Sequence, residues 1–143
     1  MTWFSDLSPC GYFGELAAPS LRAVGWLESG RDYSVGKANR AIYDKLVALC
    51  KDAWQPSVFA GTHGCDLCQY EPAAHGNANL FVPGNGHLFV CPVLVTHYMN
   101  AHAYLPPDEF CAAVLDCPAM RSVEYLKKLL ANGGRLLLSE KSD

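Results

Sequence analysis

The clearest pattern along the chain is a stripe of apolar residues at helical spacing between residues 37 and 53. Residues that recur three or four positions apart lie on one face of a helix, so this segment predicts an amphipathic helix packed on a core. Proline cannot continue the ladder of helical hydrogen bonds, and Pro56 therefore marks the end of the segment. The stripe consists of Ile42, Leu46, Leu49 and Ala53.

Three shorter helices are expected in the second half of the chain, in segments that prolines separate from one another. Proline is common in the first turn of a helix and costly in its interior, so Pro106, Pro107 and Pro118 mark boundaries rather than helix centres. Gly133 and Gly134 then supply a common signal for a helix end. The predicted helices cover residues 93–105, 108–117 and 119–132.

Runs rich in β-branched, apolar and aromatic residues predict strands. In residues 79–92, two such runs flank Gly84-Asn85-Gly86, and these residues tolerate the positive φ of tight hairpin turns. An antiparallel hairpin is therefore expected there. The other predicted strands cover residues 21–28, 57–60 and 135–140. Together these segments predict an α+β fold with a small antiparallel sheet and three to four helices.

Length and composition favour one domain over residues 1–143. Half of the residues are apolar and 17% are charged, which is ordinary for a globular protein, and the chain is long enough to bury a core. Residues 1–20 contain two prolines and two glycines among aromatic residues, and we expect them to form an irregular arm.

The charge pattern and the N-terminus restrict the partners and the compartment that we expect. The net charge is −3 and the basic residues are scattered, which disfavours a nucleic-acid surface because affinity for phosphate rests on clustered Lys and Arg. No apolar run approaches the roughly 20 residues that span a bilayer, and the N-terminus lacks the basic and apolar regions of a signal peptide. We therefore expect a cytoplasmic protein without membrane association.

The cysteines point to metal chemistry. There are seven of them, and an odd count without a signal peptide favours free or metal-bound thiols over a disulfide framework. Cys65 and Cys68 flank a turn that lets both sulfurs reach one ion, and His97 and His102 follow in a predicted helix. Zinc prefers four sulfur or nitrogen ligands, and Cys2His2 is one of its standard structural sets. The sequence predicts one structural zinc ion bound by these four residues, in a zinc-finger-like unit of knuckle, hairpin and helix over residues 63–105.

Several alternatives to this ligand set stay open. Histidines five residues apart on a regular helix differ in direction by about 140°, so they converge only if the helix is distorted near one of them. His63 and Cys91 are the candidate substitutes for a ligand. Free thiols in a loop are a further possibility. A redox dithiol is disfavoured, because such pairs begin a helix and the residues after Cys68 form a poor one.

The other cysteines, histidines and large aromatic residues have simpler expected roles. Free cysteine is often buried, so four cysteines are expected to be small core residues: Cys10, Cys50, Cys111 and Cys117. Two histidines are expected to be exposed in loop or hairpin positions: His75 and His87. Four aromatic residues are expected to fill the core, with a ligand groove as the alternative: Trp3, Phe4, Trp26 and Trp54.

Two segments resemble a family of small uncharacterised bacterial proteins. They are HGCDLC, residues 63–68, and THYMNAHAYLPPDEF, residues 96–110. The family shows a His-x-Cys-x-x-Cys knuckle and a later His-Tyr-x3-His-x-Tyr-x-Pro-Pro segment. Residues 3–14 and 23–28 are also similar to it, so the resemblance covers most of the chain. It implies a compact α+β domain around a zinc site and implies no activity.

Four protein ligands would fill a tetrahedral zinc site, which favours a structural role over catalysis. We therefore expect a non-enzymatic interaction module with a protein partner. One alternative is a zinc-dependent enzyme with an open metal position. Another is a nucleic-acid-binding finger protein, although the predicted helix 93–105 carries no Lys or Arg.

Overall fold

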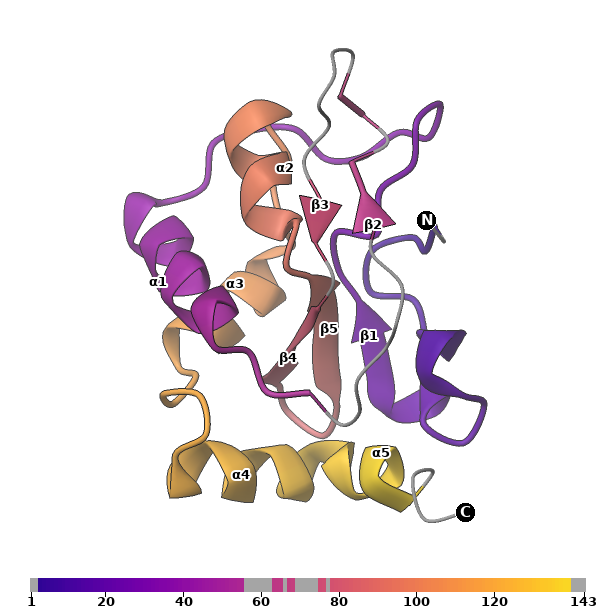
Figure 1. Ribbon diagram of the computed structural model, residues 1–143, viewed down its shortest axis with the longest axis vertical. Coiled ribbons are helices and arrows are strands. Elements are labelled where there is room, and N and C mark those ends of the chain that lie inside the picture. Colours follow the sequence, from indigo (N-terminus) through magenta and orange to yellow (C-terminus); the bar gives the residue numbers. More distant parts are fainter. Residues whose placement is uncertain (1–2, 56–62, 66, 69–74, 77, 140–143) are drawn as a thin grey trace.

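The computed structural model describes residues 3–55, 63–65, 67–68, 75–76 and 78–139. At its centre is a three-stranded sheet in the order β1-β5-β4, formed by Leu21–Ala23, Leu88–Pro92 and Asn79–Pro83 (Figure 1). β4 and β5 form the expected antiparallel hairpin, whereas β1 runs parallel to β5. The α+β prediction is confirmed, but the sheet is mixed rather than wholly antiparallel. A parallel pair needs a long crossover connection, and the chain between β1 and β5 provides one.

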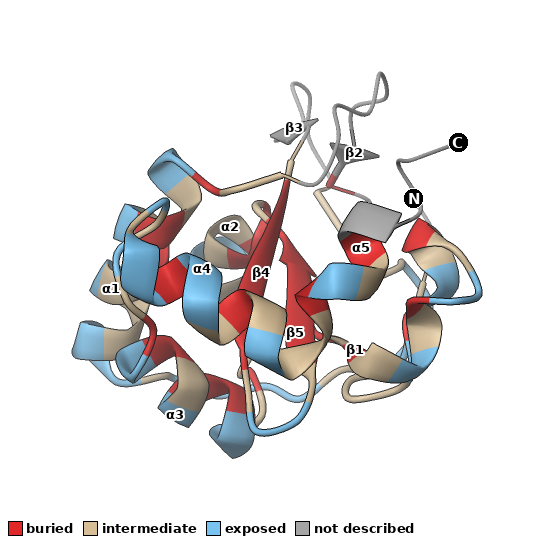
Figure 2. Ribbon diagram, turned by 90° about the horizontal axis from the view of Figure 1, so that it is seen from below, coloured by how far each residue is buried: buried red, intermediate tan, exposed pale blue. Residues whose placement is uncertain are grey.

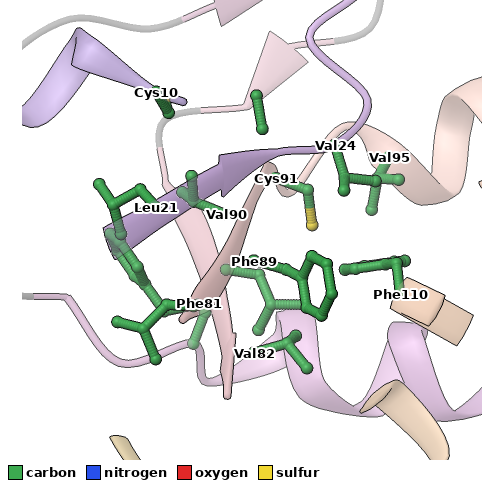
Figure 3. Packing of buried hydrophobic residues seen from close by; sticks show 14 of the residues in the cluster. Cys10, Leu21, Val24, Phe81, Val82, Phe89, Val90, Cys91, Val95 and Phe110 are labelled. Carbon is green, nitrogen blue, oxygen red and sulfur yellow. The ribbon is translucent and has the colours of Figure 1, made fainter. Parts of the chain in front are cut away.

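The sheet is the centre of the core. Every residue of β4 and β5 is buried, as expected for strands covered on both faces, and their sequences are correspondingly almost entirely apolar. Leu21 from β1, Val90 from β5 and Phe110 from helix α3 (Asp108–Leu115) belong to the same apolar cluster (Figure 3). Buried positions accordingly concentrate along the strands and the inward faces of the helices (Figure 2).

The four predicted helices are present, and each is shorter than the segment that predicted it. Asn39 accepts a hydrogen bond from the Ala41 amide at 2.7 Å, and Ser122 accepts one from the Tyr125 amide at 3.1 Å. Such caps satisfy amides that the first turn leaves free, so they set where these helices begin. None of the helices in the described part of the chain is long and apolar enough to cross a membrane. The helices are α1 (Arg40–Lys51), α2 (Val95–Ala101), α3 (Asp108–Leu115) and α4 (Val123–Leu129).

The predicted strand over residues 135–140 was wrong, because this segment continues the last helix. A wide turn, η3 (Leu130–Gly134), follows α4 and leads into helix α5 (Arg135–Ser139). Gly133 has φ 111° there, and a Cβ would lie 2.8 Å from the Ser20 Cβ, so glycine permits the kink. The apolar run was too short to distinguish strand from helix by its periodicity.

A second, two-stranded sheet was not predicted. β2 (His63–Gly64) pairs antiparallel with β3 (His75–Gly76), close to the open end of the β4–β5 hairpin (Figure 1). The predicted strand 57–60 lies outside the described residues.

The N-terminal segment packs along β1. Two short 3-10 helices, η1 (Gly11–Phe13) and η2 (Ala18–Ser20), interrupt it. The Leu7 amide donates to the Ala23 carbonyl at 2.7 Å, and the Ala23 amide donates to the Ser8 carbonyl at 2.9 Å. Residues predicted as an irregular arm therefore cover the edge of the sheet that β1 forms.

Some of the aromatic residues and cysteines expected in the core are buried, and others are only half-buried. Trp26 is fully buried and its indole donates to the Val90 carbonyl at 3.0 Å, whereas the other three aromatic residues are half-buried. Trp3 lies instead under the guanidinium of Arg31, 4.2 Å from the ring centroid. Of the four cysteines expected to be core residues, Cys50 is half-buried, and three are buried: Cys10, Cys111 and Cys117.

Within the described residues, side chains rather than another strand cover the outer edge of β4. The Tyr125 hydroxyl from α4 donates to the Phe81 carbonyl at 2.7 Å. The Gln55 side chain donates to the Asn79 carbonyl at 2.7 Å and accepts from the Asn79 amide at 3.4 Å. An edge strand that keeps free backbone groups invites pairing with other chains, so these contacts protect the sheet as well as stabilising it.

We expect Tyr125→Phe to lower the free energy of unfolding by about 1–3 kcal/mol, because the buried Phe81 carbonyl would lose its donor. Urea unfolding followed by circular dichroism measures the change. Tyr43→Phe, which removes a hydroxyl from the half-buried Tyr43 on α1, is the matched control. Equal stability of the two variants would contradict the assigned role of the Tyr125 hydroxyl.

Candidate metal centre

The β4–β5 hairpin brings two distant parts of the chain together. The cysteine pair precedes β4 and the histidine pair follows β5. Asn79 at the start of β4 lies opposite Pro92 at the end of β5, so the chain enters and leaves the hairpin at the same place. The β2–β3 pair and α2 both lie at this end (Figure 1).

The four side chains predicted as ligands form one cluster. The Cys68 Sγ lies 3.2 Å from the His97 Nε2 and 3.6 Å from the His102 Nε2. The Cys65 Sγ lies 3.4 Å from the His102 Nε2. All four potential ligand atoms lie within 4.8 Å of one another. Within the described residues, this is a group that could hold a metal ion.

The distances fit the edges of a tetrahedron around a small cation. With Zn–S bonds of about 2.3 Å and Zn–N bonds of about 2.0–2.1 Å, sulfur and nitrogen on neighbouring vertices are separated by about 3.6 Å. Ordinary hydrogen bonds between imidazole and thiol would explain single contacts of this length. They explain the whole cluster less well, because the Nε2 of His102 faces two sulfurs and carries at most one proton.

The pKa of the Cys65 thiol is raised overall, and the local backbone offsets part of that rise. Burial raises the pKa of the Cys65 thiol, and the neighbouring Cys68 side chain raises it further. The amides of Leu67 and Cys68 hydrogen-bond to the Cys65 sulfur and lower this pKa. Amide donors directed at sulfur stabilise its charged form, which is the form that binds metals.

At His97, burial favours the form of the side chain that binds metals. Burial lowers the pKa of His97, and the nearby His102 lowers it further. Both effects favour the neutral imidazole, whose unprotonated nitrogen can act as a ligand. The two rings are 5.0 Å apart, at an interplanar angle of 78°.

The end of α2 explains how two histidines five residues apart can face the same pair of cysteines. Ala101 is the last helical residue, and His102 adopts φ −123° and ψ 13°, outside the helical region. Ala103 follows with φ 55°. The His102 and Tyr104 amides both donate to the Tyr98 carbonyl, at 3.0 and 3.1 Å. The chain therefore turns back directly at His102, and this turn brings its ring towards the cysteines.

A distant segment, residues 33–36, holds this turn in place. The Tyr33 hydroxyl donates to the His102 carbonyl at 2.9 Å. The Gly36 amide donates to the Ala103 carbonyl at 2.9 Å, and the Leu105 amide donates to the Ser34 carbonyl at 2.9 Å. Sequence reasoning missed this support, because no spacing or motif relates residues 33–36 to the histidines.

A half-buried acid, Asp6, also anchors this turn. The Tyr104 hydroxyl donates to the Asp6 Oδ2 at 2.8 Å, and the Gly25 amide donates to the Asp6 Oδ1 at 3.1 Å. Burial raises the pKa of Asp6 above its usual range, although both donors lower it. Burial and the neighbouring Asp6 raise the pKa of Tyr104. Asp6 and Tyr104 were not predicted as parts of the site.

The alternative ligands lie elsewhere or outside the described side chains. Cys91 is fully buried in β5, and burial raises its pKa well above the usual thiol range. It is not part of the cluster. Nothing is described of the side chains of His63 and His75. His87 is half-buried rather than exposed, with its ring edge-on to Phe89 at 4.9 Å.

Comparison with known proteins identifies the family without a function. The family described as "Domain of unknown function (DUF7919)" matches residues 2–115, a range that includes the four clustered side chains. No curated protein matches the chain. No solved structure matches it.

We expect Tyr104→Phe to destabilise the protein by about 1–3 kcal/mol at neutral pH, because the half-buried Asp6 carboxylate would lose a donor. The folded-state pKa of Asp6 is already raised, so its protonation favours folding below its ordinary pKa, and this contribution is lost as the pH rises through the raised value. Removing a donor raises that pKa further. The loss of unfolding free energy caused by Tyr104→Phe should therefore be smaller at acidic pH than at neutral pH. Urea unfolding across pH 3.5–7.5 measures it.

The Asp6→Asn background provides the control, because the side chain at position 6 no longer titrates. There the effect of Tyr104→Phe should not change with pH. A deficit that is equally large at both ends of the range in the unmodified background would contradict the role given to Asp6.

Proposed function

The chain belongs to the DUF7919 family, and we propose that it is a zinc-binding protein in which one structural zinc ion supports a non-enzymatic protein-interaction module. The observation that carries this proposal is the convergence of four side chains from two separate parts of the chain. Their sulfur–nitrogen separations of 3.2–3.6 Å are close to those around tetrahedral zinc.

The donor set supports zinc over other cations. Calcium and magnesium prefer oxygen ligands, and the cluster contains sulfur and nitrogen only. Two thiolates would balance the charge of a divalent ion, and two imidazoles complete four-coordination. Zinc accepts this mixed set and has no geometric demand beyond the tetrahedron.

A structural role is supported by what the ion would connect. It would join Cys65 and Cys68, before the hairpin, to the two ends of α2 after it. Binding free energy of this kind adds directly to folding free energy. A catalytic zinc would need an open position and a nearby proton carrier, and the four-residue cluster of the described part of the chain includes no Asp or Glu.

The interaction role is supported by apolar side chains that the fold leaves exposed. Val35, next to the turn at His102, is 67% exposed, and Leu16 and Val123 are similarly uncovered. Two basic residues that could serve nucleic acid are instead paired with acids: Arg121 with Asp52, and Lys128 with Asp116. A protein partner is therefore preferred to nucleic acid.

We expect protein purified without chelator to contain one zinc ion per chain by elemental mass spectrometry. Cobalt substitution should give the visible spectrum of a tetrahedral site with thiolate ligands. Cys65→Ser and His102→Ala should each lose most of the bound zinc, because three ligands remain. Cys50→Ala and His87→Gln change residues outside the cluster and should retain it. Absence of stoichiometric zinc in the unmodified protein would overturn the metal assignment.

Chelation tests the structural role separately from the presence of zinc. We expect removal of zinc with EDTA to lower the melting temperature by about 10 °C or more, since metal binding contributes several kcal/mol to folding and 1 kcal/mol corresponds to about 2–4 °C in a chain near this size. Differential scanning calorimetry measures the shift. A zinc-containing protein whose melting temperature does not change on chelation would retain the metal site but not its structural role.

A further inference from the structure

A groove of about 420 Å³ lies between the start of α1 and the end of α2. This volume is within the range of ordinary ligand sites. One wall is formed by residues 36–38, Arg40 and Tyr43, and the other by residues 99–101 and Ala103. Figure 1 shows α1 beside α2, with the segment that leads into α1 passing the end of α2.

The base of the groove is held by hydrogen bonds between its two walls. The Gly36 amide donates to the Ala103 carbonyl at 2.9 Å. A Cβ at position 36 would lie 2.9 Å from the Leu105 Cδ2, so a larger residue there would require the Leu105 side chain to shift. Val35 and Tyr104 form an isolated β-bridge immediately beside it. The groove is therefore built into the fold rather than left between loosely packed side chains.

The groove carries positive charge in a chain whose net charge is −3. Its lining includes Lys37 and Arg40 and no acidic residue. Arg40 pairs with Asp44 at 3.0 Å, but both side chains are more than half exposed, so the pair is weak and a competing carboxylate can displace it. Among the described residues, Lys37 forms no ion pair. These charges favour an anionic occupant.

The remaining surface of the groove favours an occupant with apolar side chains as well. Tyr43 and Met99 are half-buried in its lining, and Val35 at its margin is 67% exposed. Methionine adapts its shape to different apolar partners. The exposed Asn100 offers both donors and an acceptor to a peptide backbone.

A nucleic acid is a less suitable occupant of the groove. The affinity of proteins for nucleic acids rests on many phosphate contacts, and the groove offers only two cations beside apolar surface.

We infer that this groove is the docking site for an acidic peptide segment of a partner protein, with an apolar side chain between its carboxylates. This rests on the proposed interaction function and specifies its surface and partner chemistry. Carboxylates of the segment meet Lys37 and Arg40, and the apolar side chain packs on Tyr43 and Met99.

The candidate metal centre controls one wall of this groove. Residues 99–101 lie between His97 and His102, and Ala103 directly follows the second histidine. A metal ion that binds both histidines fixes this segment against the rest of the fold. Chelation therefore weakens peptide binding without removing Lys37 or Arg40.

Nuclear magnetic resonance titration of the ¹⁵N-labelled full chain, purified without chelator and with its zinc content measured, tests the inference. The probe is a set of hexapeptides with three Glu residues around one Leu, Met or Phe, added up to millimolar concentration. We expect amide shifts in residues 36–43 and 99–103. Matched hexapeptides with Lys in place of Glu should leave these amides unshifted.

The affinities of two double variants with the same net charge test the role of Lys37 and Arg40 quantitatively. Lys37→Gln with Arg40→Gln should weaken binding of the best hexapeptide at least fivefold, and added salt should weaken it in the unmodified protein. Lys51→Gln with Lys127→Gln changes the net charge equally at exposed positions outside the groove, and it should leave the affinity within twofold. Melting temperatures and zinc content of both double variants should match those of the unmodified protein.

Three results would overturn the inference: no shift in the groove with any acidic hexapeptide, equal weakening in both double variants, or saturation of the groove by inorganic phosphate or an oligonucleotide but not by peptide. Failure of the groove is distinguishable from failure of the proposed zinc site. Peptide binding without stoichiometric zinc would support the docking site and contradict the zinc site. Stoichiometric zinc without peptide binding would support the zinc site and contradict the docking site.

Discussion

The reversal of the chain at the end of α2 determines where His102 points, and the candidate metal centre depends on it. In a continuous helix, His97 and His102 would point about 140° apart and could not face one pair of sulfurs. The helix instead ends at Ala101, and the Tyr33 hydroxyl holds the His102 carbonyl. The hydrogen bond between the buried Tyr104 and the half-buried Asp6 holds the residues that follow. Segments separated by about 70 residues or more along the chain thus orient one imidazole, as supporting residues do around known metal sites.

The buried hairpin is the second requirement, because it delivers both ligand pairs to one place. Its antiparallel register joins the start of β4 to the end of β5, so residues before and after it emerge together. The cluster then lies at the margin of an apolar core, where burial affects both thiol and imidazole pKa values. The end of α2 serves two purposes in this arrangement, since it positions two candidate ligands and lines the groove beside α1. Metal binding and partner docking would therefore share one structural element.

Most of the helices were predictable, because an apolar stripe such as Ile42, Leu46 and Leu49 reports directly on the face that packs. The hairpin was equally accessible from Gly84-Asn85-Gly86, whose conformational preferences are local. Two elements could not be predicted in this way. The run after Gly134 was too short to separate strand from helix, and it is helical as α5. The parallel direction of β1 depends on which strand it meets, and its own three residues hold no information on that choice.

The sequence by itself determined the chemistry that is available: two thiols separated by a short turn, two imidazoles five residues apart, and a turn between two apolar arms. Only the tertiary structure decided that the four side chains meet, that Cys91 stays in the core, and that His102 leaves the helix. The physical reason is the range of the interactions. Helical periodicity and turn preferences act over a few residues, whereas the contacts of Asp6 with Tyr104 and of Tyr33 with His102 join segments 98 and 69 residues apart. No local pattern encodes such contacts.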